Sequence, residues 1–393
     1  MRAEGIFGEA VDRIGGEPIT ARMARKTPIR HLDPSLLFIT LLISTFGAIM
    51  VFSTTLNDQE AAGLDPNFFL KRQIAYAVAG AVVLLLVSTF DYRHLRGFAP
   101  IIYGITIVGL ILVLTPLGEV QKGASRWINL GAFQAQPSEL AKLAIIITAG
   151  AYLAERKGEV RLRDVLLTVA LVGLPGFLIY LEPDIGTMLV FVALLGGILL
   201  VGGAKIRHFV LLGAMAALTV LVVIQAGVLK DYQVQRLTAF LDPNPDVRSE
   251  GYNLTQSKIA IGSGGMRGKG LHQENTQTSL DFVPEQHTDF IFTAVGEQLG
   301  FIGSATLLGL FGFLIWRALR IAAMSRDLFG TLIAAGIAAL WSFQLFINIG
   351  MTMGIMPITG IPLPFVSYGG SSLVTNFAAV GLLLNIHMRR FMS

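Results

Sequence analysis

Three carboxylates and a histidine lie close together in one short stretch of the sequence. Asp281, Glu285, His287 and Asp289 fall within nine residues, directly ahead of an apolar run that begins at Phe290. A carboxylate within hydrogen-bond reach of a substrate hydroxyl can take its proton as a general base. An ionisable group beside hydrocarbon is costly and normally faces a cavity or a partner. The stretch is therefore a candidate catalytic site, with Asp289 as the candidate base.

A structural role for Asp289 stays open at this stage. Residues 288 to 316 are predicted to form one helix, in which Asp289 and Glu297 share a stripe with small residues. At the start of that helix, Asp289 is also placed to act as a first-turn acid that the helix dipole favours. Asp281 and Glu285 lie just upstream and would already serve that purpose, which favours the catalytic interpretation.

A second set of candidates flanks a predicted helix that begins at Pro137. Lys142 lies roughly 8 Å along this helix, at about 1.5 Å per residue, which is too deep for a loop charge. Two interpretations remain. Either Lys142 pairs with Glu139 at a spacing of three residues, or it holds an anionic ligand, with Arg126 and Trp127 at the mouth of the site.

The remaining polar motifs lie in predicted loops. Asp184 occupies a short turn between two apolar runs, and Arg236 belongs to the long loop 230–287. The glycine-rich run 261–270 departs from the nucleotide-binding pattern at its first glycine and at its final Ser/Thr. A nucleotide site is therefore not predicted, although a basic, backbone-rich loop can still hold a phosphate.

Residues 354–372 contain three prolines and four glycines. Irregular backbone at membrane depth persists only where it is buried in protein or lines a cavity. We therefore expect this segment to re-enter the bundle as cavity lining, and we include its Ser367 and Tyr368 among the site candidates.

The elements that must position these residues are transmembrane helices. The chain has 393 residues, 53% of them hydrophobic, and a mean hydropathy of +0.65. One soluble core could not bury so many apolar runs, so the fold class is an all-α polytopic membrane protein. With no cysteine, disulfides and thiolate chemistry are excluded. The ten predicted spans are 35–55, 73–90, 97–116, 137–154, 165–181, 188–203, 209–229, 288–316, 328–354 and 373–388.

The distribution of basic residues predicts the orientation of these spans. Loops on the side of both termini carry 19 Lys and Arg, against 10 on the opposite side. Both termini are therefore predicted to be cytoplasmic, and the long loop between helices 7 and 8 to be outside. The first run, 35–55, is too long for a cleaved signal peptide, so it is expected to be retained. Because the basic residues lie at helix ends, no nucleic-acid partner is expected.

Together these stretches resemble the SEDS family (shape, elongation, division, sporulation), whose members are peptidoglycan glycosyltransferases that polymerise lipid II. The resemblance implies one ten-helix membrane domain over residues 33–391, after a cytoplasmic segment 1–32. Gly360–Pro364 resembles the elongation branch of the family more than the division branch. The most specific shared motifs are Pro284–Phe290 with Gly296–Gly300, Pro137–Lys142 and Pro364–Ser372.

The resemblance implies a function and a set of site residues. The family's essential aspartate falls on Asp289, which would be the catalytic base in the bacterial cytoplasmic membrane. A class B penicillin-binding protein would be the partner that crosslinks the strands, and membrane lipid would surround the bundle. Whether a metal is required is left open, with Mg²⁺ or Mn²⁺ as the candidate ion. The residues assigned to substrate binding are Arg126, Trp127, Glu139, Lys142, Asp184, Arg236, Asp281, Glu285, His287, Ser367 and Tyr368.

Other functions remain as alternatives. A lipid II flippase would also need ten spans and intramembrane charges, but no internal repeat of the kind common in transporters is evident. A septal polymerase of the same family would share the site. A scaffold protein that recruits cell-wall enzymes would not need Asp289.

Overall fold

The apolar runs form the helices of a membrane-type bundle in the computed structural model. The structure describes residues 31–121, 124–129, 131, 133–156, 159–225, 250–271, 276–278, 280, 282–283 and 285–390.

Among the described residues, eight helices are long and apolar enough to cross a membrane. Two shorter apolar helices, α8 and α9, follow α7, and every one of these helices overlaps a predicted span. The all-helical fold class is confirmed, while the count of ten crossings stays a prediction. The helices are α3 (Pro34–Ala61), α4 (Phe68–Thr89), α5 (Tyr92–Val113), α6 (Pro137–Ala154), α7 (Leu162–Leu181), α8 (Ile185–Val201), α9 (Ile206–Gln225), α12 (Ile291–Met324), α13 (Leu328–Met353) and α14 (Gly370–Arg389).

Short polar signals fix where these helices begin and end. The Asp33 carboxylate accepts hydrogen bonds from the backbone N–H groups of Ser35 and Leu36, at 3.1 and 3.2 Å, and so caps α3. Asp327 caps α13 in the same way. Gly354 ends α13 in the left-handed conformation, with a φ of 75° that favours glycine.

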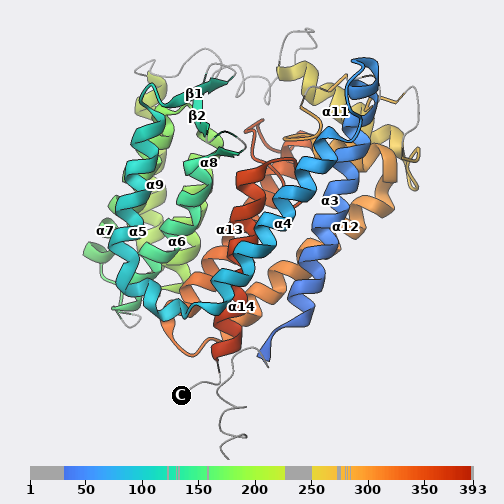
Figure 1. The fold of residues 1–393 in the computed structure, drawn as a ribbon. Coiled ribbons are helices and arrows are strands. Elements are labelled where there is room, and N and C mark those ends of the chain that lie inside the picture. Colours follow the sequence, from blue (N-terminus) through green and yellow to red (C-terminus); the bar gives the residue numbers. More distant parts are fainter. Residues whose placement is uncertain are drawn as a thin grey trace, which may run out of the picture.

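The bundle has two chemically different ends (Figure 1). The basic end comprises the start of α3, the end of α14 and the turns α4–α5, α6–α7, α8–α9 and α12–α13. The loop end carries the α3–α4 and α7–α8 turns, a small sheet, and the irregular segments before α12 and between α13 and α14. Every site residue that the sequence predicted and the structure describes lies in the half of the bundle nearer the loop end.

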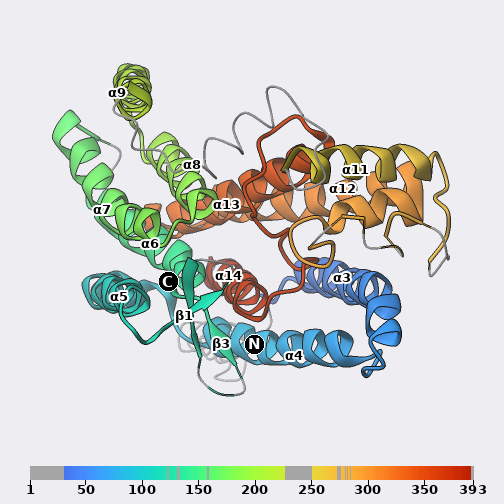
Figure 2. The same ribbon diagram turned by 90° about the horizontal axis from the view of Figure 1, so that it is seen from above.

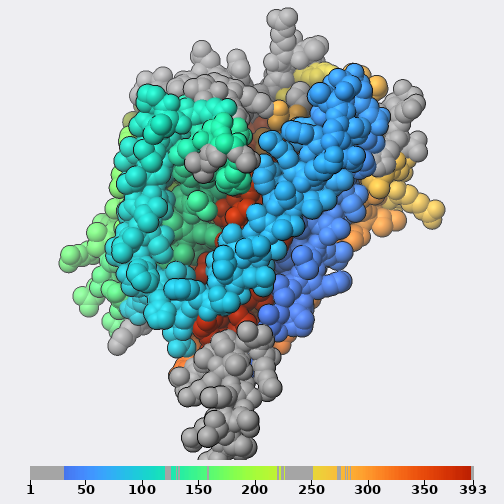
Figure 3. All heavy atoms as spheres, in the orientation of Figure 1, coloured from blue at the N-terminus to red at the C-terminus, as the bar shows by residue number. Residues whose placement is uncertain are grey.

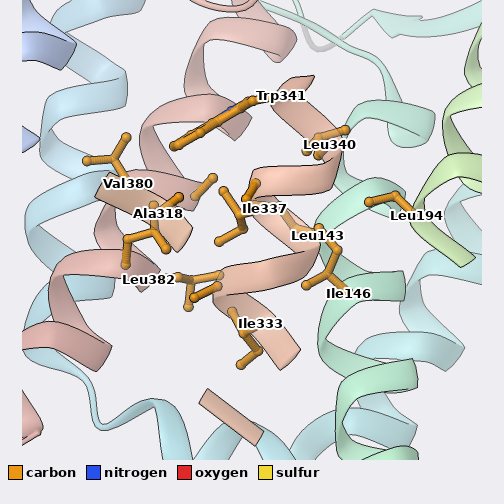
Figure 4. Close-up of a cluster of buried hydrophobic side chains, with 14 of the residues drawn as sticks. Leu143, Ile146, Leu194, Ala318, Ile333, Ile337, Leu340, Trp341, Val380 and Leu382 are labelled. Atoms are coloured by element: carbon orange, nitrogen blue, oxygen red, sulfur yellow. The ribbon is translucent and has the colours of Figure 1, made fainter. Parts of the chain in front are cut away.

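Helix α13 runs through the centre of the bundle and contacts α6, α8, α12 and α14. Figure 4 shows its Ile337 and Trp341 among side chains of those neighbours. Small residues permit the close approach, since a Cβ on Gly336 would lie 2.9 Å from the Ile146 side chain. In a bilayer, such close packing stabilises helix association where the hydrophobic effect between helices does not.

Helix α9 stands at the periphery (Figure 2). Its Ile206, Val210 and Leu218 side chains are exposed in the isolated chain. Apolar side chains on an outward helix face are what contact with lipid requires, so this helix needs no second protein layer.

A three-stranded antiparallel sheet, absent from the sequence prediction, covers part of the loop end. Its strands are β1 (Gly118–Gln121), β2 (Ala124–Asn129) and β3 (Gln134–Ala135), in the order β1-β2-β3. Strands this short carry too few residues for a recognisable alternation.

A further helix, α11 (Glu250–Gly264), lies inside the predicted loop 230–287. It packs on α12 and α13, where the Ser257 hydroxyl lies 2.6 Å from the Thr293 hydroxyl and donates to the Thr352 carbonyl at 2.8 Å. The predicted loop therefore contains a helix that the sequence analysis did not foresee.

Candidate active site

The turn that carries Asp289 is held by backbone hydrogen bonds on several sides. The Asn348 amide of α13 donates to the Asp289 carbonyl at 2.9 Å. The Ser367 hydroxyl donates to the Thr288 carbonyl at 2.6 Å, and the Tyr368 N–H donates to the His287 carbonyl at 2.8 Å. Three consecutive carbonyls are thus fixed by residues distant in sequence, which positions the turn rigidly.

Asp289 does not lie in the first turn of a helix. Helix α12 begins at Ile291, so Asp289 belongs to the preceding turn, and the predicted start of this span at residue 288 is wrong. Its side chain is half-buried. A Cβ on Gly360 would lie 3.2 Å from Asp289 Oδ2, and the φ of 68° at Gly360 also favours glycine. The re-entrant segment therefore passes directly beside the carboxylate.

Glu285 and His287 lie in the same turn. The Glu285 carboxylate accepts a hydrogen bond from the Thr288 hydroxyl at 3.0 Å. The His287 ring lies 5.0 Å from the Phe69 ring and 5.8 Å from the Tyr368 ring, measured between centroids. The structure thus brings together Glu285, His287, Asp289, Ser367 and Tyr368, as the sequence analysis expected for one site.

The α6 residues form a buried ion pair. Lys142 Nζ lies 2.6 Å from Glu139 Oε1, and each residue is only 2% exposed. Glu139 Oε2 has no hydrogen-bond partner among the described residues. The pairing alternative of the sequence analysis is therefore realised in this structure, with one carboxylate oxygen still available to another group.

Arg126 contacts protein rather than pointing into open space. Its guanidinium donates to the backbone carbonyls of Glu182 and Pro183, and so joins β2 to the α7–α8 turn. Trp127, its neighbour on β2, pairs with Glu119 of β1 and is partly buried.

The α7–α8 turn also holds two buried acids. Asp184 caps α8, accepting from the Thr187 N–H at 3.0 Å and from the Thr187 hydroxyl at 2.9 Å. Glu182 is 1% exposed, and neither carboxylate oxygen has a hydrogen-bond partner among the described residues. Burial, with a smaller contribution from the Asp184 charge, raises the pKa of Glu182 to about 8, against the opposing effect of Arg126.

This turn is in contact with the segment that flanks Asp289. A Cβ on Gly186, at the start of α8, would lie 2.5 Å from the Thr359 carbonyl oxygen and 3.0 Å from the Ile361 side chain. Thr359 and Ile361 flank Gly360, which lies beside Asp289. The segment around Gly360 therefore lies between the Asp184 turn and the carboxylate of Asp289.

Glu297 has a structural role that the sequence analysis did not foresee. It is fully buried and accepts hydrogen bonds from the Lys269 ammonium, the Gln277 N–H, and both the N–H and the hydroxyl of Thr278. The N–H groups of Lys269 and Gly270 donate to carbonyls of α12. The end of the glycine-rich run is thus docked on α12, where those two N–H groups are already engaged.

Several buried polar atoms near the loop end lack partners among the described residues. They are the Ser138 hydroxyl, both amide atoms of Gln344, and the Thr375 hydroxyl. Their helices, α6, α13 and α14, contact one another. Buried polar atoms are almost always hydrogen-bonded, so each of these atoms is available to water or a polar ligand.

An apolar groove of 360 Å³ runs between α4, α5, α6 and α14. Its walls include Leu86 of α4, Leu95 of α5 and Leu143 of α6, and Leu382 of α14 contributes to its floor. Figure 3 shows the hollow between α4 and α5 with α14 behind it. Lys142 itself is not among the lining residues, although Leu143 directly follows it on α6.

The sequence analysis missed Asn348, Gln73 and Gln344. Asn348 binds the carbonyls of Asp289 and Ile361, and the Gln73 amide donates to the Ser367 carbonyl at 3.4 Å. Each is a polar residue inside an apolar run, which was the available signal. Arg236 and Asp281 lie outside the described residues.

Fold and site together define a multi-pass helical membrane protein with a polar site at one end of the bundle. The chain matches the family model "Cell cycle protein", which covers FtsW, RodA and SpoVE, over residues 34–391. The chain therefore belongs to this family, the SEDS family of the sequence analysis.

Related proteins and structures agree with this assignment. The chain is 38% identical over 366 residues to the peptidoglycan glycosyltransferase MrdB of Escherichia coli (strain K12), covering 92% of this chain and 95% of the relative. It is 38% identical to stage V sporulation protein E of Bacillus subtilis (strain 168), covering 90% and 96%. A chain of a peptidoglycan synthase complex that coordinates polymerization and crosslinking superimposes with a TM-score of 0.77, at 32% identity and with 92% and 99% coverage. Thermus thermophilus RodA, a rod shape determining protein, gives a TM-score of 0.68 at 29% identity, with 92% and 98% coverage.

Proposed function

We propose that this protein is a peptidoglycan glycosyltransferase that polymerises lipid II into glycan strands during cell elongation, in the bacterial cytoplasmic membrane. The similarity to MrdB and to RodA supports the elongation role. The single observation that carries the proposal is the half-buried Asp289, whose turn is fixed by Asn348, Ser367 and Tyr368 at the loop end of the bundle.

Asp289 is the base in the proposed reaction. Its carboxylate takes the proton of the 4-hydroxyl of the acceptor sugar as that oxygen bonds to the anomeric carbon of the donor. The bond from this carbon to the pyrophosphate breaks, the configuration inverts, and undecaprenyl pyrophosphate leaves with the bonding electrons. A base fixed on rigid elements needs little reorganisation at this step.

The substrate's parts have matching surroundings. The apolar groove beside α6 suits a polyprenyl chain. Lys142, which precedes Leu143 of the groove lining on α6, would attract a pyrophosphate in exchange for part of its contact with Glu139. The unpartnered polar atoms of α6, α13 and α14 would bind sugar or peptide groups.

A divalent cation, Mg²⁺ or Mn²⁺, is proposed as an optional cofactor. Within the described ranges no group of three metal-ligating side chains occurs. Mg²⁺ is nevertheless often held by one or two carboxylates together with substrate phosphates. Glu285 would be a protein ligand together with substrate phosphates, and the ion would neutralise charge on the leaving group.

The proposed orientation places the loop end outside the cytoplasm and both termini inside. A class B penicillin-binding protein is the proposed partner, since nascent strands must be crosslinked and a similar chain occurs in a synthase complex that does both. Polymerase activity that is equal with and without every class B partner would remove the partner as an activator.

The test of the function uses purified protein, labelled lipid II and a gel that resolves glycan polymers. We predict that Asp289→Asn abolishes polymer while lipid II binding is largely kept, because the amide has the same size but takes no proton. The loss should be about a hundredfold to ten-thousandfold in turnover. Glu285→Gln should reduce turnover less, unless it binds a metal, in which case extra Mg²⁺ should partly rescue it.

Two outcomes would contradict the proposal. Substantial polymer from folded Asp289→Asn protein would remove Asp289 as the base. A parent protein that makes no polymer but moves lipid II across vesicle membranes would instead be a flippase. A septal polymerase would pass the same assay, and rescue of rod shape in cells depleted of their elongation polymerase distinguishes it.

A further inference from the structure

A second cavity opens at the basic end, away from the candidate active site. It measures 480 Å³, within the range of small-molecule pockets. Arg93 and Arg96 of α5 form one wall, and Arg326 and Asp327 of the α12–α13 turn form another, with Ala154 of α6 between them. We call this cavity the arginine pocket.

The pocket is rich in positive charge. Asp327 is the acid among its lining residues, and that carboxylate already accepts hydrogen bonds from the Gly330 N–H and the Tyr92 hydroxyl. Arg93 Nε lies 3.7 Å from Asp327 Oδ2, and Arg96 lies 3.6 Å from the Glu155 carboxylate outside the pocket. Exposed ion pairs of this length are weak, and the lining, with three arginines and one aspartate, carries net positive charge.

The walls of the pocket are fixed by packing beneath it. The Tyr92 ring stacks on Phe329 with centroids 6.2 Å apart, and Tyr92 is buried. A Cβ on Gly330 would lie 3.1 Å from Tyr92, so the start of α13 is held tightly against the start of α5. The arginines therefore project from two elements whose separation is set by the core.

We propose that the arginine pocket binds the phosphate group of an anionic phospholipid. Guanidinium groups bind phosphate oxygens in a bidentate manner, and arginines on two walls can hold one phosphate between them. The pocket lies where transmembrane helices end, the depth of lipid headgroups, and basic pockets of this kind between helices bind such headgroups. Phe98, Ile101 and Ile105 are exposed farther along α5 and offer an apolar path for acyl chains.

This proposal does not rest on the polymerase reaction, because the pocket is at the opposite end of the bundle. The test is native mass spectrometry on the full chain in detergent, with equal amounts of phosphatidylglycerol and phosphatidylcholine carrying the same acyl chains. The variant Arg96→Gln/Arg326→Gln is compared with Arg163→Gln/Arg207→Gln, which removes two arginines of the same end that do not line the pocket.

The parent and the control pair should retain phosphatidylglycerol in preference to phosphatidylcholine. The pocket variant should lose that preference by about five-fold for each arginine removed. Arg326 lies on an exposed turn, so Arg326→Gln alone supplies a folded variant if the double variant unfolds. Excess inorganic phosphate should not displace the lipid.

Three results would overturn the proposal. Equal retention of the two lipids by the parent would do so, and would leave an acidic protein segment as the ligand to test. If the pocket variant and the control variant lost the same share of the preference for phosphatidylglycerol, the effect would come from the overall positive charge of this end and not from the pocket. If inorganic phosphate displaced the lipid fully, and if phosphate alone raised the melting temperature as much as the lipid does, the pocket would be assigned to a soluble anion.

Discussion

At the scale of single residues, Lys142 and Glu139 form an ion pair in which each residue is only 2% exposed. Removing one partner from a buried ion pair typically costs roughly 3–5 kcal/mol, because the other charge is left without compensation. We predict that Lys142→Ala lowers the melting temperature of the protein and abolishes polymerisation, as measured by a thermal melt and the lipid II assay.

The double variant Lys142→Ala/Glu139→Ala separates the two roles of this pair. It removes both charges, so much of the lost stability should return, while polymerisation should stay low if Lys142 faces the pyrophosphate. Restored full activity would show that the pair is only structural and would end the phosphate role.

Glu182 should make the stability of the protein depend on pH. Its pKa is about 8 in the folded protein, against an ordinary value of 4.5. Between these values the folded form holds a proton that the unfolded chain has lost, so the stabilisation is complete below 4.5 and is lost as pH rises to about 8. Each unit of pKa difference corresponds to about 1.4 kcal/mol, an upper bound here because solvent and neighbouring groups relax.

We predict that Glu182→Gln, which keeps a neutral side chain at every pH, flattens this dependence. The melting temperature of the variant relative to the parent should rise steadily across that window and level off above it. Melting curves recorded over the pH range test this, and parallel curves for the two proteins would contradict it.

At the scale of elements, helix α12 depends on a kink at Gly300. Its φ of 65° is left-handed, and a Cβ there would lie 2.3 Å from the Gly268 nitrogen and 2.8 Å from the Met266 carbonyl carbon. We predict that Gly300→Ala costs roughly 1–3 kcal/mol of backbone strain and detaches the segment that Glu297 anchors. A lower melting temperature and faster proteolysis near Lys269 would report both effects.

The same helix supplies the matched controls. Gly309 and Gly312 have open space where a Cβ would lie, and neither has a positive φ. Ala at either position should be neutral or slightly stabilising, since Gly costs a helix interior roughly 0.5–1 kcal/mol. If Gly300→Ala behaved like these controls, neither the kink nor the docked segment would matter to stability.

At the scale of the whole molecule, the proposed orientation can be tested with introduced cysteines, because the chain contains none. Ala62 lies in the exposed α3–α4 turn at the loop end, and Glu159 is exposed at the basic end. A membrane-impermeant maleimide that can reach the outer face of the cytoplasmic membrane should label Ala62→Cys on intact cells. It should label Glu159→Cys only after the cells are lysed. The reverse pattern would invert the topology and move the Asp289 turn to the wrong side for external synthesis.

The sequence by itself determined the fold class and the approximate position of each apolar helix. Hydropathy is a local property, so runs of apolar residues mark helices without knowledge of their neighbours. Helix ends follow from equally local signals, such as Pro137 at the start of α6 and Gly354 at the end of α13. The charge crowding around Asp289 likewise indicated a site before any contact was known.

Only the tertiary structure decided how that site is built. Asp289 is held by Asn348, 59 residues away, and Thr288 by Ser367, 79 residues away. Lys142 could have faced a ligand or Glu139, and the packing around α6 selected the ion pair. The sheet and α11 likewise lack the hydropathy of a span, and their pairing and packing partners lie on other elements. Contacts between distant segments depend on how helices pack, and the hydropathy of any one segment carries no information about them.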